Sequence, residues 1–263
     1  MSGIRAKHVR VAILLSVLAV VVLYALRDVM RRRERADWDR TLDVALVLVT
    51  EGSADAAALG DMRSRVPALA ARLRDQFARY RPSAPAPFAF TVYGPVPRAV
   101  ALPDPPGDGL VAAMRHAFAL WRFTRDIDGR ATVPSRGFDA RLYVVVRPPT
   151  DRALVEGISE HGGHIGIASS ELDGSTVDLA LFVAAHELFH ILGASDRYAA
   201  DGSTLFPDGL AEPDLVPQFP QRYAELMARN RPLSATDEAR PESLDELWVG
   251  AKTASEIGWA VTP

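Results

Sequence analysis

Short, continuously apolar stretches alternate along the chain with longer segments whose apolar residues recur at helical spacing. The short stretches are rich in β-branched or aromatic residues, as is typical of strands, and they cover residues 42–50, 88–93, 141–147 and 164–170. The longer segments predict helices at residues 54–80, 109–125, 177–192 and 243–257. Elements in this order indicate an α/β (α+β) sandwich with a mixed, twisted sheet. We expect Trp121 and Phe123 of the second helix to pack into its core.

A separate apolar run without charged residues covers residues 11–26, and arginines crowd both of its ends. As a helix this run would rise about 24 Å, and snorkelling by Arg10 and Arg27 can make up the difference from a hydrocarbon core of about 30 Å. A cleaved signal peptide and a buried core helix are the alternatives. The poor cleavage site after the run and the flanking arginines favour an uncleaved transmembrane helix. We therefore expect residues 1–40 to be a membrane anchor with a basic juxtamembrane segment, and residues 41–263 to be one domain.

The orientation of this anchor follows from two opposing signals. More arginines follow the apolar run than precede it, which favours a cytoplasmic C-terminal domain. A basic segment ahead of the first apolar run favours the opposite orientation, as in a signal anchor. We expect a single-pass membrane protein whose larger domain is extracytoplasmic.

Composition limits the classes of function that remain. The 263 residues are 48% hydrophobic with a formal net charge of −3, which is ample for one well-buried domain and gives no electrostatic footprint for nucleic acid. The chain has no cysteine, which excludes cysteine-ligated zinc fingers, disulfide frameworks and thiol catalysis. Zero cysteine is compatible with either side of a membrane.

The candidate chemistry is concentrated in the predicted helix at residues 177–192. His186 and His190 are one helical turn apart on the same face, so their imidazoles can grip one metal ion. Glu187 follows about 100° further round, within reach of a water on that metal. Since the helix is apolar on nearly every side, these three polar side chains would be costly to bury without a cation. A bare HExxH also arises by chance, so the residues that follow it matter.

Those residues provide a turn and a third carboxylate. Gly193 lacks a Cβ, so it can end the helix and turn the chain back. The turn can bring Asp196 to the metal as a third ligand. Three protein ligands with an open fourth position are the arrangement of a catalytic Zn²⁺ site.

The pattern from His186 to Asp196 resembles the extended zinc signature of the metzincin clan of metalloproteases, HExxHxxGxx followed by a third ligand. Most of that clan has histidine as the third ligand, and Asp196 resembles the snapalysin-type variant. The resemblance implies a metzincin-like zincin fold with an active-site helix, a methionine turn and a C-terminal helix. It makes Met227 the thioether floor beneath the zinc, not a ligand; a core-filling methionine is the alternative. It also implies that extended peptide pairs with an edge strand, expected here between Gly163 and Ala168.

Four further side chains are weaker candidates for the same site. Tyr198 and Tyr223 are the tyrosines that could stabilise an oxyanion, a role some metzincins give to a tyrosine near the zinc. His161 and His164 lie near the expected substrate edge, where we favour a structural or solvated role over a ligand role.

An acidic loop after the zinc signature could bind calcium through oxygen atoms, but it fits no EF-hand spacing. A solvated acidic loop is the interpretation we favour for its residues, which are Asp201, Asp208, Glu212 and Asp214 with Gly202 and Gly209.

Together these patterns predict a membrane-anchored, zinc-dependent endopeptidase with Glu187 as general base. Two alternatives stay open. One is a catalytically silent, membrane-tethered pseudo-protease that binds a peptide or protein, and the other is a zinc hydrolase of non-peptide amides.

Overall fold

A computed structural model describes residues 34–105, 107–149, 155–159 and 163–260, with scattered positions before residue 34. The chain divides into two compact units, Met1–Asp37 and Trp38–Pro263. In the part of the chain that is described, no helix combines the length and the apolar content needed to cross a membrane. Half of the residues of the anchor expected at residues 11–26 lie outside the described residues.

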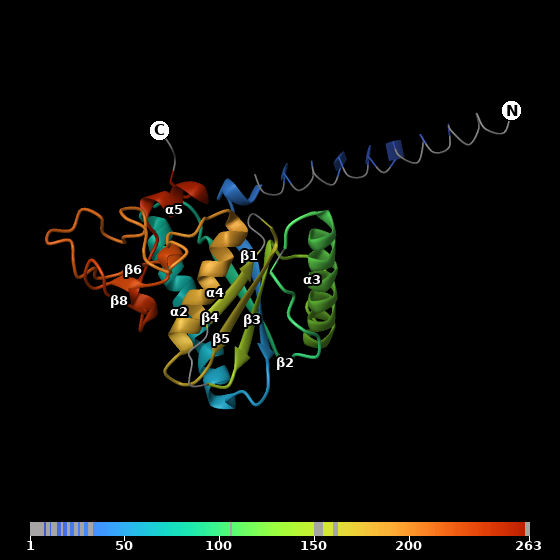
Figure 1. The fold of residues 1–263 in the computed structure, drawn as a ribbon, viewed down its shortest axis with the longest axis horizontal. Coiled ribbons are helices and arrows are strands. Elements are labelled where there is room, and N and C mark those ends of the chain that lie inside the picture. Colours follow the sequence, from blue (N-terminus) through green and yellow to red (C-terminus); the bar gives the residue numbers. More distant parts are fainter. Residues whose placement is uncertain are drawn as a thin grey trace. The chain divides into compact units, whose positions relative to one another are not determined.

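The second unit has mixed α/β architecture (Figure 1). Its first half contains β1 (Leu42–Thr50), α2 (Ala56–Ala78), β2 (Phe88–Pro97), α3 (Leu110–Ala131), β3 (Ala140–Arg147), β4 (Val155–Ser159), β5 (Ile165–Glu171) and α4 (Val177–Leu192). After a long irregular segment come β6 (Ala224–Glu225), the 3₁₀ helix η1 (Leu226–Ala228), β7 (Arg231–Pro232), β8 (Glu238–Ala239), the 3₁₀ helix η2 (Leu244–Glu246), β9 (Leu247–Trp248) and α5 (Ala251–Glu256).

The main sheet has the strand order β2-β1-β3-β5-β4. The first four of these strands run parallel to one another, and β4 pairs with β5 in the antiparallel direction. Figure 1 shows α2 and α4 on one face of the sheet and α3 on the other. Both faces are therefore covered, which explains why the strands read as continuous apolar runs.

Alternate residues of β1 supply the two halves of the core. Val44, Leu46 and Leu48 join the cluster formed with α2 and α4. Ala45, Val47 and Val49 join the cluster that lies against α3. All six side chains are fully buried, as the period of two in a strand requires when both faces are packed.

The sequence pattern predicted the edge strand of the sheet at the wrong place. The stretch from Gly163 to Ala168 falls mainly in β5, which is an internal strand with β3 on one side and β4 on the other. Gly166 and Ala168 are paired with Ser159 and Gly157 of β4. The backbone of β5 is already committed on both sides, so β4 is the edge strand.

The predicted C-terminal helix at residues 243–257 was also wrong. That segment forms η2, β9 and the short helix α5, because its backbone pairs with distant parts of the chain. Trp248 pairs with Glu225 in a two-stranded parallel ladder. Gly250 then has extended backbone (φ −71°, ψ 164°), and its N–H donates to Glu225 Oε1 at 3.1 Å. These contacts interrupt any continuous helix.

One of the two aromatic side chains expected in the core under α3 is not there. Phe123 is fully buried, but Trp121 is 54% exposed. The helix extends to Ala131, and its buried side chains are Leu120, Phe123, Thr124, Ile127 and Ala131, which lie on a different face from Trp121.

Candidate metal centre

The helix that carries the HExxH motif is buried along almost its whole length. Asp178 lies in its first turn, where a carboxylate is favourable, and it forms an ion pair with Arg65 of α2. The helix ends as expected at Gly193, which has a left-handed φ of 103°. The N–H of Gly193 donates to His190 O at 3.0 Å and that of Ala194 to Phe189 O at 2.9 Å, so the last carbonyls are satisfied.

Three potential ligand atoms converge beside this helix end. His186 Nε2 and His190 Nε2 are 3.0 Å apart. Asp196 Oδ1 lies 3.3 Å from the first of these nitrogens and 3.1 Å from the second. Two ligands at about 2 Å from a tetrahedral zinc ion would be separated by about 3.3 Å, so the triangle has a suitable size for a divalent metal. The turn at Gly193 thus brings Asp196 back to the histidine pair.

The hydrogen bonds on the far side of each imidazole define which nitrogen is available. His186 Nδ1 lies 2.9 Å from the carbonyl oxygen of Leu226, and His190 Nδ1 lies 2.9 Å from that of Ala194. A carbonyl only accepts, so each Nδ1 carries a proton and donates it. In the neutral rings both Nε2 atoms then present lone pairs to each other and to a carboxylate. A cation among them removes this repulsion, and backbone acceptors on the other ring nitrogen are the usual support of metal-bound histidine.

The close contact of these groups also shifts the pKa values of Asp196 and His190. The two imidazoles hold the pKa of Asp196 below its ordinary value, although burial acts in the opposite direction. Burial alone would lower the pKa of His190, but the charges of Asp196 and Glu187 outweigh it and raise that pKa. Asp196 Oδ1 is buried and faces the Nε2 atoms of His186 and His190 at 3.3 and 3.1 Å. An ionised carboxylate oxygen in this position matches a metal ligand.

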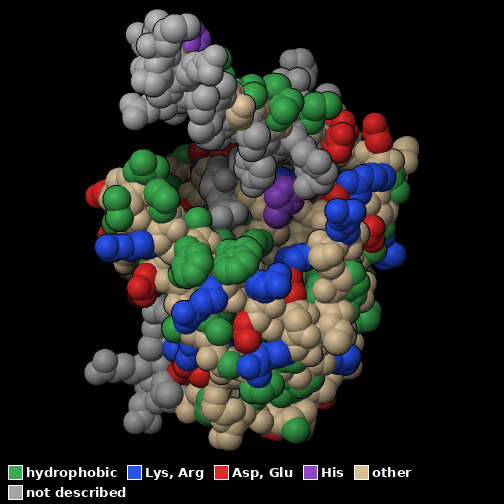
Figure 2. Space-filling view, turned by 90° about the vertical axis from the view of Figure 1, so that its right-hand side faces the viewer, with side chains coloured by type: hydrophobic (Ala, Val, Ile, Leu, Met, Phe, Trp, Pro, Cys, Tyr) green, Lys and Arg blue, Asp and Glu red, His purple; other side chains and the backbone are tan. Residues whose placement is uncertain are grey.

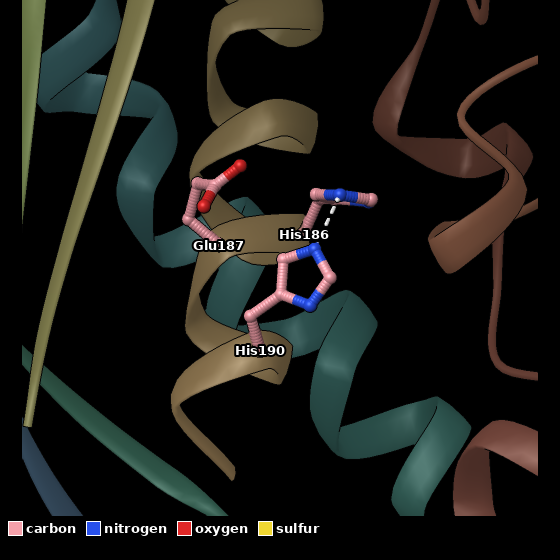
Figure 3. Close-up of side chains that lie close together, drawn as sticks. All are labelled: His186, Glu187 and His190. Atoms are coloured by element: carbon pink, nitrogen blue, oxygen red, sulfur yellow. Dashed lines mark hydrogen bonds between the residues drawn. The ribbon is translucent and has the colours of Figure 1, made fainter. Parts of the chain in front are cut away.

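Glu187 completes the buried group, as Figure 3 shows. Its side chain is 4% exposed, and one carboxylate oxygen lies within 4.8 Å of a ring nitrogen of each histidine. The His186, Glu187 and His190 side chains are therefore geometrically able to hold a metal ion. The Cβ of Glu187 faces Gly166 of β5, where an added Cβ would meet it at 3.4 Å. The absence of a side chain at Gly166 lets α4 lie close to the sheet.

The segment around Met227 packs against the histidine helix and supports the site. The 3₁₀ helix η1 packs against α4, and Met227 is fully buried. Besides the contact of Leu226 with His186, the Met227 carbonyl accepts a hydrogen bond from the N–H of Arg197 at 2.9 Å. One short turn therefore contacts both the histidine helix and the irregular segment that contains Asp196.

Glu225 organises this turn, a role that the sequence did not predict. Its side chain is fully buried. Oε2 accepts hydrogen bonds from the N–H groups of Met227 and Ala228, at 2.6 and 3.1 Å. Oε1 accepts from the N–H of Gly250 at 3.1 Å and from the hydroxyl of Thr253 at 2.7 Å. Burial raises the pKa of Glu225, with the four donors acting against it. No local pattern could reveal this residue, because two of its four donors are at least 25 positions away.

The two candidate tyrosines have different surroundings. Tyr198 stacks on the ring of His186, with ring centroids 6.4 Å apart and planes at 27°. Burial and the charge of Asp196 raise the pKa of Tyr198, and Arg229 lies over its ring at 5.1 Å. Tyr223 instead stacks on Trp248, with centroids 4.8 Å apart. The structure therefore brings Tyr198, and not Tyr223, to the histidine pair.

Three of the remaining candidates, His164, Asp201 and Glu212, have partners outside the metal centre. His164 Nδ1 lies 3.1 Å from the carbonyl oxygen of Asp139, and His161 lies outside the described residues. In the acidic loop, Asp201 accepts hydrogen bonds from Ser203, and Glu212 forms an ion pair with Arg222. Within the described ranges, the cluster of His186, Glu187 and His190 is the group of histidine and carboxylate side chains able to hold a metal, and Asp196 Oδ1 lies within 3.3 Å of both histidines.

Comparison with known proteins adds no family assignment. No protein-family model matches this chain, and no curated protein sequence matches it significantly.

Proposed function

We propose that this chain is a zinc-dependent endopeptidase with a metzincin-like fold. His186, His190 and Asp196 would hold the metal, and Glu187 would act as general base. The observation that supports this most is the convergence of His186 Nε2, His190 Nε2 and Asp196 Oδ1 within 3.3 Å of one another. The fixed tautomers of both histidines add to it, because they direct a lone pair from each ring to the same point.

The choice of metal and reaction follows from the chemistry of these groups. Two imidazoles and one carboxylate are a donor set that suits zinc in catalytic sites. Zinc bound there would supply Lewis acidity and make a water molecule more acidic. Glu187, buried next to the ligands, would take a proton from the attacking water and deliver it to the leaving amine of the peptide. Hydrolysis then needs no covalent intermediate with the chain.

An extended substrate would add to the outer edge of β4, which is the edge strand beside β5 in the sheet order. Peptides commonly bind in this way, since backbone hydrogen bonds to an edge strand hold many different sequences. β4 lies next to β5, and β5 carries the glycine that faces Glu187. A peptide bound to β4 would therefore lie near the proposed base.

Two variants of the full-length chain test this function. Glu187→Gln should retain one zinc per chain by elemental analysis and lose hydrolysis of a mixed peptide library by a factor of at least about 100, the scale of general-base catalysis. Asp196→Ala should lose both zinc and hydrolysis, whereas the control Asp201→Ala, in the exposed loop, should lose neither.

The same measurements separate the alternatives. A wild-type chain that holds zinc and binds peptides without cleaving any would be a pseudo-protease. A chain that spares the peptides and hydrolyses other amides would be a hydrolase of a different class. Unchanged cleavage by Glu187→Gln would refute the assigned mechanism.

A further inference from the structure

The helix α3 carries a second apolar face that no described part of the chain covers. Its core face is formed by Leu120, Phe123 and Ile127. On the opposite side lies a row of large apolar side chains that are each more than half exposed: Leu110 (77%), Val111 (63%), Met114 (64%), Phe118 (62%) and Trp121 (54%). We call these five residues the α3 stripe. At 100° per residue they fall within an arc of about 100°, so they form one continuous surface along three turns.

Arginines accompany this stripe within the helix, and the exposed Asp108 lies just before it. Arg115, Arg122 and Arg125 are exposed, and Arg125 lies over the ring of Trp121 with its Cζ 5.7 Å from the centroid. Between positions 109 and 125 the sequence contains no aspartate or glutamate. Figure 2 looks onto this side of the molecule and shows green hydrophobic side chains together with blue basic ones and some red acidic ones.

The two acidic residues later in the helix have basic partners of their own. Asp126 forms an ion pair with Arg130, at 3.0 Å. Asp128 is paired with Arg141 at 2.5 Å and accepts a hydrogen bond from Tyr143 at 2.7 Å. Their charges are therefore compensated locally. The three exposed arginines then outnumber the exposed Asp108, so the net charge along the α3 stripe is positive.

We propose that the α3 stripe is an interfacial surface that binds anionic lipid headgroups and inserts its apolar side chains at the acyl boundary. An exposed apolar row with Trp and Phe, flanked by arginine and with no acidic residue between positions 109 and 125, is the composition of a helix that lies in a membrane interface. A second copy of the same surface is a poorer partner. It would bring three exposed arginines of each copy together with only Asp108 of each copy to offset them. This surface is separate from the metal centre, which lies across the sheet, so the proposal does not depend on the enzymatic function.

The absence of cysteine allows a direct test on the full-length chain. Ala117 is exposed beside the α3 stripe, and Ala68 is an exposed alanine on α2. Each is replaced by cysteine, as Ala117→Cys or Ala68→Cys, and labelled with a fluorophore that brightens in lipid. The two labelled proteins are compared on vesicles of phosphatidylcholine alone and of phosphatidylcholine with phosphatidylglycerol. Because the fluorophore reports only its own surroundings, attachment of the chain through residues 11–26 would not mask the result.

We expect the label at position 117, and not that at position 68, to shift to the blue on vesicles that contain phosphatidylglycerol. Each exposed arginine near an anionic surface contributes about a fivefold change in this equilibrium. Arg122→Gln should therefore weaken the response about fivefold, and Arg74→Gln, an exposed arginine of α2, should leave it unchanged. Phe118→Ser should abolish it while leaving the circular dichroism spectrum of the protein intact.

Three results would overturn the proposal. One is a label at position 117 that responds equally to both kinds of vesicle or to neither. Another is an equal response at positions 117 and 68. The third is self-association in solution that Phe118→Ser abolishes, which would assign the α3 stripe to a second copy of this chain.

Discussion

Glu256 and Arg197 form an ion pair of 2.5 Å between α5 and the chain that follows the histidine helix. The other carboxylate oxygen of Glu256 accepts a hydrogen bond from the N–H of Ser195 at 2.9 Å. Glu256 therefore holds both neighbours of Asp196, one on each side. A side chain 60 residues away in the sequence thus sets the position of the third proposed ligand.

Removal of this support should weaken metal binding without removing a ligand. We expect Glu256→Ala to lower zinc affinity about 10- to 100-fold, the usual effect of losing an outer support of a metal site. Glu256→Gln keeps an acceptor for the N–H of Ser195, so its zinc affinity should lie between those of Glu256→Ala and the wild type. A competition titration with a zinc chelator measures the affinity. Glu246→Ala, which removes a similar ion pair with Arg231, is the matched control and should leave it unchanged.

The parts of the structure that sequence patterns predicted are those determined by local residues. Residues 177–192 are apolar all round and are followed by Gly193, and the helix has these bounds. β1 likewise follows a run of β-branched residues that ends at Thr50. The spacing of His186 and His190 could be read from helical geometry alone, as could the turn toward Asp196.

The parts that failed depend on partners far along the chain. The segment after position 243 has helical periodicity, but pairing with β6 and capping by Glu225 outweigh it. β4 is five residues long and contains Gly157, so no pattern marked it, and the edge of the sheet was consequently assigned to β5. Trp121 and Phe123 both belong to apolar rows at helical spacing, but these rows lie on different faces of α3. Only the position of the sheet decides which row is buried, and it buries the one with Phe123.

Zinc affinity should depend on pH through His190. The pKa of this imidazole is raised above its ordinary value, so in the metal-free protein it is protonated at any pH below that raised pKa. Zinc must displace this proton, and each pH unit below the pKa should lower the apparent affinity about tenfold. Above the pKa no such dependence is expected. Asp196, whose pKa is lowered, stays ionised throughout this range.

Calorimetric titration with zinc in buffers of different ionisation enthalpy would count the released protons. Glu187→Gln provides the control, because Glu187 helps to raise the pKa of His190 without being a proposed ligand. In the Glu187→Gln variant, the loss of apparent zinc affinity on acidification should begin at a lower pH than in the wild type. An identical onset in both proteins would show that Glu187 does not influence the histidine.

Glu225 should be among the costliest side chains to remove. Glu225→Ala would leave three backbone N–H groups and the Thr253 hydroxyl without their buried acceptor. We expect the free energy of unfolding to fall by about 3–5 kcal/mol. Urea denaturation of the metal-free protein measures this loss. Glu242→Ala, at an exposed position, should stay within about 0.5 kcal/mol of the wild type, and a similarly small effect for Glu225→Ala would mean that the η1 turn holds without its carboxylate.

Gly166 should control how closely α4 approaches the sheet. An added Cβ there would lie 3.1 Å from Leu142 Cδ1, 3.1 Å from Ile191 Cδ1 and 3.4 Å from Glu187 Cβ. Gly166→Ala should therefore destabilise the protein by about 1–3 kcal/mol, as overpacking of a core does, and should displace Glu187 from the histidines. Thermal unfolding and zinc content should show a less stable protein that still binds the metal, with peptide hydrolysis reduced more than zinc content.

Gly60→Ala in α2 is the matched control, because nothing lies within 4 Å of its added Cβ, and it should stabilise the protein by about 0.5–1 kcal/mol. If both variants gained stability, the contact between Gly166 and Glu187 would not limit the packing of α4.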